Sequence, residues 1–72
     1  MNFKIFPNPT NGQITLQFDK AISNEILIFD VLGRLVFNDF IKNKDEVQLD
    51  LKLSAGVYFL KIGETIERII FN

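Results

Sequence analysis

The chain has 72 residues, of which 47% are hydrophobic, and it carries a formal net charge of −1 with no histidine and no cysteine. This length suits one small domain, residues 1–72, and the apolar content is too high for a disordered segment. The balanced charge offers no surplus of cations for nucleic acid, no run approaches the roughly 20 apolar residues that span a membrane, and without cysteine neither disulfides nor thiolate zinc can hold the fold.

The chain opens with a short apolar run, 3–6, that leads into a rigid corner with the sequence Pro-Asn-Pro-Thr-Asn-Gly. Pro7 and Pro9 each fix their own φ near −65° and keep the preceding residue out of the helical region. Asn11 and Gly12 then form a dipeptide that tolerates positive φ. The next strand can therefore start in a changed direction.

Alternating apolar and polar residues predict most of the strands. The runs 13–18 and 47–53 alternate regularly, which is typical of strands with one buried and one exposed face. The runs 25–30 and 57–62 carry apolar residues on both faces, which is typical of central strands covered on both sides. Further strands are predicted at 3–6, 35–40 and 66–71. About seven short strands without a sustained helical pattern indicate an all-β fold, an antiparallel β-sandwich with Greek-key connections.

The turns support this prediction. Asp30 and Gly33 occupy the first and fourth positions of a type I turn, where glycine accepts the left-handed conformation of a bulged hairpin. Gly63 stands at the first central position of a two-residue hairpin, which favours type II′. Tyr58, two residues after Gly56, resembles a tyrosine corner, in which the hydroxyl donates to backbone a few residues upstream. Each of these residues has a sufficient structural explanation.

The residue inventory argues against catalysis. Without histidine and cysteine the chain lacks the usual general base near neutral pH, the thiolate nucleophile and the commonest transition-metal ligands. Its two serines, Ser23 and Ser54, lie in predicted turns with no motif that supplies a base. Acidic pairs such as Asp45 with Glu46 lack the ligand spacing of a calcium loop. We therefore expect no enzyme, no cofactor and no metal, and from these arguments alone the function stays open.

Four segments in a fixed order carry a more specific signal: 6–12, 28–34, 53–62 and 68–71. The residues that carry it are Pro7, Asn8, Pro9, Asn11, Gly12, Asp30, Gly33, Arg34, Gly56, Tyr58, Arg68, Ile69 and Ile70. Together these segments resemble the type A C-terminal sorting domain of the type IX (Por) secretion system. The resemblance spans nearly the whole chain.

This resemblance implies an Ig-like β-sandwich that is a recognised signal and not an enzyme. In that family the domain stands at the C-terminus of exported proteins of Bacteroidota and directs an N-terminally fused cargo through the outer-membrane translocon. A cell-surface sortase then commonly removes it, and many cargoes are attached to lipopolysaccharide. The implied partners are translocon and sortase components and the fused cargo. The implied location is the periplasm in transit, then the cell surface or the medium.

The ends of the chain and its aromatic content bear on the alternatives. Met1 directly precedes the first strand, so we expect a domain excised from a longer precursor that carries the export signal, with an orphan reading frame as the alternative. The chain closes on Phe71 and Asn72, where family members often carry further lysines. An Ig-like or fibronectin-like adhesion or carbohydrate-binding module is the alternative function, disfavoured because the chain has no Trp and one Tyr. The edge of the last strand could receive a partner's strand or pair weakly with a second copy.

Overall fold

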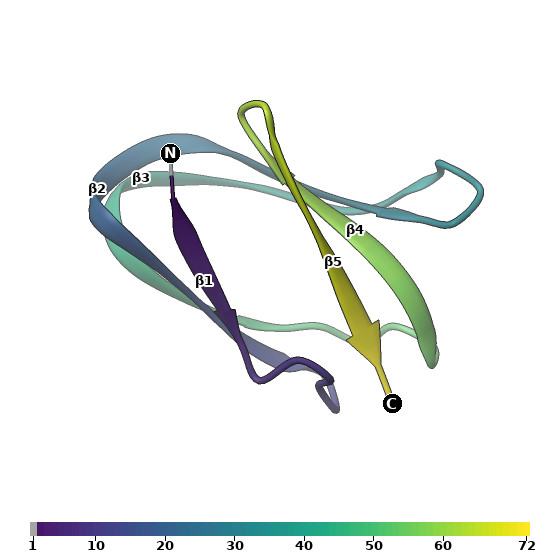
Figure 1. Cartoon of the computed structure of the whole chain (residues 1–72). Coiled ribbons are helices and arrows are strands. Elements are labelled where there is room, and N and C mark those ends of the chain that lie inside the picture. Colours follow the sequence, from purple (N-terminus) through teal and green to yellow (C-terminus); the bar gives the residue numbers. More distant parts are fainter. Residues whose placement is uncertain (1) are drawn as a thin grey trace.

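The computed structural model describes residues 2–72, and every regular element in this range is a β-strand (Figure 1). The five strands are β1 (Phe3–Phe6), β2 (Gln13–Asp30), β3 (Leu35–Asp50), β4 (Gly56–Ile62) and β5 (Thr65–Phe71). They form one antiparallel sheet in the order β1-β2-β4-β5, with β3 paired to the other edge of β2. The prediction of an all-β antiparallel domain is therefore confirmed. Met1 lies outside the described residues. Within residues 2–72 there is no helix of the length and apolar character needed to span a membrane.

The described range contains five strands where the sequence predicts about seven. The predicted strands 13–18 and 25–30 are two parts of one strand, β2. The predicted strand 35–40 and most of the predicted strand 47–53 are likewise parts of one strand, β3, which continues through the polar residues between them. Register shifts near Ile22 let β2 bend while it stays paired with β3. The polar residues that suggest loops are thus part of bent, continuous strands, and the strand count predicted from the sequence is wrong.

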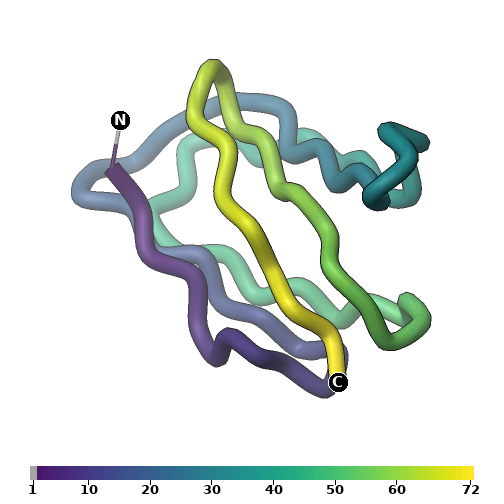
Figure 2. Tube along the Cα trace, turned by 45° about the vertical axis from the view of Figure 1, so that its right-hand side comes forward, coloured from purple at the N-terminus to yellow at the C-terminus, as the bar shows by residue number. Residues whose placement is uncertain are grey.

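The bends curl the sheet into a half-barrel, so the two separate layers of the predicted sandwich are not distinct. β1 pairs with the first half of β2, between Thr15 and Phe18, whereas β4 pairs with its second half, between Leu27 and Asp30. In Figure 2 the segment after β1 (purple) comes close to the end of β5 (yellow) at the bottom of the view. A parallel bridge between Thr10 and β5 joins the two margins of the sheet there.

The core lies inside the curl. Its buried apolar side chains are Ile14, Leu16, Phe18, Ile26, Ile28, Ile41, Leu49, Leu51, Tyr58, Leu60, Ile62, Ile69 and Phe71. The run 13–18 buries its apolar face, as predicted. In the two-faced runs, Ile28 and Leu60 are fully buried, whereas their neighbours Phe29 and Phe59 are only half-buried. No other element within residues 2–72 packs on that second face, so the expectation that these strands are covered on both sides is not met.

Candidate functional site

The proline corner, residues 7–12, is fastened to β5. The Asn8 side chain accepts a hydrogen bond from the backbone N–H of Ile70 at 2.9 Å and donates one to the backbone carbonyl of Arg68 at 3.0 Å. The backbone N–H of Thr10 donates to the Ile70 carbonyl at 2.9 Å, and the Thr10 carbonyl accepts from the N–H of the last residue at 2.8 Å. Asn8 and Thr10 therefore act as a short substitute strand along the edge of β5.

Thr10 organises the corner, although no sequence expectation rests on it. Its side chain is buried, with 1% of the residue exposed. The hydroxyl accepts a hydrogen bond from the N–H of Gly12 at 3.0 Å and donates one to the carbonyl of Gln13 at 2.6 Å. A threonine two residues before a glycine is the pattern of a side-chain turn, in which the hydroxyl replaces a backbone group. That signal is present in the sequence and would have identified Thr10.

Gly12 lies where the corner meets the chain that follows β3. Its φ is +134°, and its carbonyl accepts a hydrogen bond from the N–H of Leu51 at 2.7 Å. A Cβ atom at this position would lie 2.8 Å from the Leu51 carbonyl oxygen, so only glycine fits. The predicted positive φ is confirmed for Gly12. Asn11 does not have a positive φ, and its Oδ1 accepts a hydrogen bond from the side chain of Asn72 at 3.3 Å.

The turn 30–34 between β2 and β3 is built around the Asp30 carboxylate. Its Oδ1 accepts the backbone N–H groups of Leu32 and Arg34, both at 2.9 Å, and its Oδ2 accepts Nε of Arg34 at 2.7 Å. Gly33 has a φ of +82° and donates to the Asp30 carbonyl at 3.0 Å, as the bulged type I turn predicts. The hydrogen bonds from the Arg34 backbone, the Arg34 side chain and Leu32 hold the pKa of the Asp30 carboxyl below its ordinary value, because they favour the ionised form.

The segment 54–58 forms the predicted tyrosine corner. The Tyr58 hydroxyl donates to the Ser54 carbonyl at 2.8 Å, and the Tyr58 ring packs edge-on against Phe71 with centroids 5.0 Å apart. A shallow pocket of about 280 Å³ lies between this corner and the turn 30–34, and both segments line it. The second and third predicted motifs are thus neighbours in space.

The proline corner, the start of β4 and the end of β5 meet at one end of the sheet, whereas the turn 30–34 lies to the side of that end, next to the tyrosine corner. Asp30 pairs with Tyr58 and Tyr58 with Ile69, while Gly56 pairs with the residue after Ile70. Figure 1 shows the corner after β1, the start of β4 and the C-terminus close together at the bottom of the view. Most of the predicted site residues build this end, through buried side chains or hydrogen bonds within it. Arg34, whose side chain is 73% exposed, and the exposed Arg68 display their charges to solvent.

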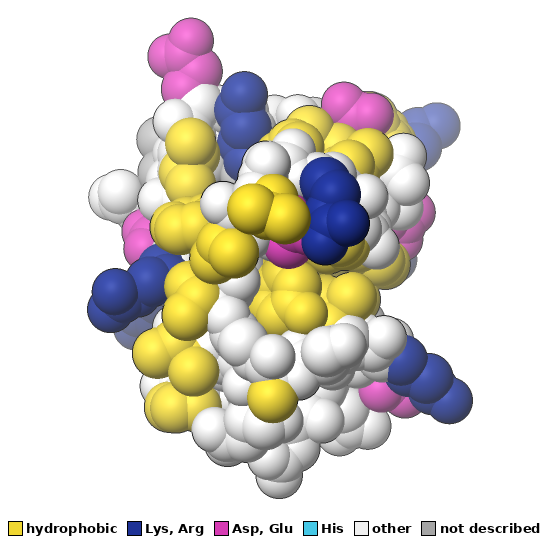
Figure 3. Space-filling model, turned by 90° about the vertical axis from the view of Figure 1, so that its right-hand side faces the viewer, with side chains coloured by type: hydrophobic (Ala, Val, Ile, Leu, Met, Phe, Trp, Pro, Cys, Tyr) yellow, Lys and Arg dark blue, Asp and Glu magenta, His cyan; other side chains and the backbone are white. Residues whose placement is uncertain are grey.

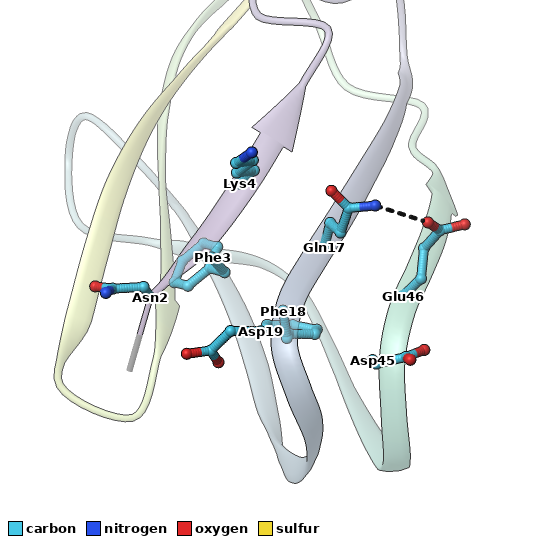
Figure 4. Close-up of a pocket in the computed structure, with 8 residues that line it drawn as sticks. All are labelled: Asn2, Phe3, Lys4, Gln17, Phe18, Asp19, Asp45 and Glu46. Atoms are coloured by element: carbon cyan, nitrogen blue, oxygen red, sulfur yellow. Dashed lines mark hydrogen bonds between the residues drawn. The ribbon is translucent and has the colours of Figure 1, made fainter.

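A larger pocket of about 400 Å³ lies at the bend of β2 and β3, beside the start of β1 (Figure 4). Phe3 and Phe18 form its apolar part, and Gln17 on its rim donates to Glu46 at 3.3 Å. None of the predicted site residues lines this pocket. Residues 2–72 also hold no group of three or more acidic side chains placed to bind a metal ion. The pocket therefore has no link to the motifs and no metal-binding donor set.

Comparison with known proteins identifies one family. Residues 4–71 match the family model described as the secretion system C-terminal sorting domain. No curated protein matches the chain significantly. The matched range includes the proline corner, the turn 30–34, the tyrosine corner and all but the last residue of the chain's C-terminal end.

Proposed function

The chain belongs to the secretion system C-terminal sorting domains, and from this membership we propose that it is a type A domain that routes a fused cargo through the type IX outer-membrane translocon. Domains of this family are secretion signals without catalytic activity. In this proposal residues 1–72 form one signal domain behind the cargo. The protein passes through the periplasm, a surface sortase removes the domain, and the cargo reaches the cell surface or the medium.

The curled sheet is, in this proposal, the counterpart of the family's Ig-like sandwich. β2 and β3 each contribute one segment to each half of the curled sheet, because both strands bend and continue instead of ending in loops. Two long strands then replace four short ones. This accounts for the difference between five strands and the expected seven while the core still lies between two halves of the sheet.

The observation that carries the proposal is the family match over residues 4–71, a range that includes all four of the motif segments. A signal read near the end of a chain works best when that end is already ordered, because binding then costs little conformational entropy. Asn8 and Thr10 supply this order through their bonds to β5. The residues of the corner, the turn and the tyrosine corner are therefore proposed to shape the signal. The exposed Arg34 and Arg68 are proposed to be read directly.

An export assay tests this function. The chain is fused through a short linker to a fluorescent protein carrying a periplasmic export signal, in a host with a type IX system. We expect fluorescence at the cell surface or in the medium, and periplasmic fluorescence for the reporter without the chain. Periplasmic retention of the fusion, while a known sorting domain exports the same reporter, would overturn the proposal.

A further inference from the structure

One face of the sheet half formed by β2, β4 and β5 is apolar and uncovered. The antiparallel register sets Phe29 beside Phe59 and Val57 beside Ile70. Residues directly opposite each other in antiparallel strands point to the same side, so these pairs form one surface. We call this surface the outer face, and its apolar members on the three strands are Leu27, Phe29, Val57, Phe59, Ile66 and Ile70.

The outer face is accessible to a partner. Ile66 is 57% exposed and Val57 36%, and the other four side chains are half-buried. Figure 3 shows hydrophobic side chains in a long exposed band on the left of the view, the side on which β5 lies. Contiguous apolar surface on a small domain marks a place where another molecule binds. β2 and β4 carry apolar residues on both faces, but within residues 2–72 the fold covers only the core-facing one. This also indicates that another molecule binds the outer face.

The charges on the outer face define the chemistry of that partner. The register places the half-buried Lys61 between Leu27 and Ile66, and the exposed Arg68 beside Phe59. A purely apolar cover would strip water from both cations without compensation. The covering surface must therefore bring carboxylates to Lys61 and Arg68 as well as apolar side chains.

A second copy of the chain meets this requirement poorly. In the second half of β2, the part that belongs to the outer face, this side carries one carboxylate, Glu25, which pairs in register with Phe40 at the margin away from β5. Two copies stacked through the outer face would bury Lys61 and Arg68 from each copy against one Glu25 apiece, which leaves excess positive charge in the interface. An anionic membrane is disfavoured because the whole chain has a net charge of −1 and gains no long-range attraction.

We propose that the outer face binds a protein of the secretion machinery whose contact surface has an apolar centre flanked by carboxylates that pair with Lys61 and Arg68. The inference rests on the proposed function and deepens it. Arg68 and Ile70 connect the two, because they belong to the last family segment and also point to the outer face. Recognition then takes place on the flat of the sheet, while the proline corner holds β5 in position.

Variants in the export assay test this inference. Ile66→Glu and Arg68→Glu alter exposed side chains, and each should reduce export of the reporter by about tenfold or more, as expected when a central contact is lost. Arg68→Lys keeps the cation and should restore most export. Two matched controls lie away from the face and from the motif segments: Ala21→Glu, at an exposed apolar side chain on the bend of β2, and Lys52→Glu, an exposed cation between β3 and β4. Both should be exported like the unaltered chain.

The midpoint of thermal unfolding is also measured for each purified variant. A loss of export is attributed to the outer face only where this midpoint equals that of the unaltered chain. Normal export of both face variants, with the unaltered chain exported, would overturn this inference and leave the proposed function standing. Retention of the unaltered chain would overturn both. A purified chain that dimerises, or binds vesicles containing anionic lipid, in a manner abolished by Ile66→Glu would assign the face to a second copy or a membrane and overturn the partner named here.

Discussion

Gly12 and Gly33 both have positive φ, but their surroundings differ. A Cβ atom on Gly33 would have no neighbour within 4 Å, whereas one on Gly12 would lie 2.8 Å from the Leu51 carbonyl oxygen. Gly33→Ala should therefore cost only the left-handed backbone conformation, about 1–2 kcal/mol. Gly12→Ala adds a backbone clash and should cost at least about 3 kcal/mol. Urea unfolding of the two variants measures the difference, and equal losses would contradict the contact at Leu51.

Asp30 makes the stability of the fold depend on pH. Because folding lowers the pKa of this carboxyl below its ordinary value of 3.8, its contribution is complete above that value and is lost as the pH falls through the lower folded pKa. Asp30→Asn should lower the unfolding midpoint at pH 7 and flatten its decline below about pH 4. Thermal unfolding at several pH values checks this, with Asp50→Asn as the control for losing one exposed carboxylate. An Asp30→Asn chain with the original acid dependence would refute the role of Asp30.

At the scale of elements, local chemistry predicts more than long-range contact does. The turn 30–34 and the bond from Tyr58 to Ser54 follow from residues four or fewer positions apart, and both predictions are confirmed. The contact of Asn8 with Ile70 joins residues 62 positions apart and depends on how the sheet curls. The alternation of apolar and polar residues does not predict how the sheet curls, because a polar stretch where a strand bends has the same composition as a solvated loop between two strands. The sequence therefore predicts the motifs and their local shapes, but not that Asn8 and β5 meet.

Asn8 tests the link between the corner and β5. Asn8→Ala removes an acceptor for the Ile70 N–H and a donor to the Arg68 carbonyl, two bonds worth about 0.5–1.5 kcal/mol each. We expect faster amide exchange at Ile70 and an overall loss of about 1–3 kcal/mol. The control is Asn38→Ala, an exposed asparagine on β3 for which no side-chain hydrogen bond is described. Unchanged exchange at Ile70 would show that the corner does not hold the strand.

At the scale of the whole molecule, the beginning of the chain orders its end. Thr10 bridges to Phe71, and the ring of Phe71 packs on Tyr58, so the corner, β5 and the tyrosine corner depend on one another. The outer face inherits this order, because β5 carries part of it. A change at the proline corner can thus alter recognition on the outer face without touching the partner.

The same dependence predicts the effect of deleting residues 69–72. The deletion removes Ile69 and Phe71, which are 0% and 3% exposed, and the hydrogen bonds that close the corner. Losing two large core side chains costs about 2–5 kcal/mol each. That sum is comparable to the whole stability of a domain of this size, about 4–11 kcal/mol.

The shortened chain should therefore show no cooperative unfolding transition by circular dichroism, and export of its fusion should fail because the signal is unfolded. Arg68→Glu, which leaves the core intact, should lose export while it still unfolds cooperatively. A shortened chain that unfolds cooperatively would contradict the dependence of the corner on β5. The deletion alone cannot show why export fails, because residues 69–72 contribute both to the core and to the outer face. Comparison with Arg68→Glu separates a folded signal that its partner no longer recognises from a signal that is unfolded.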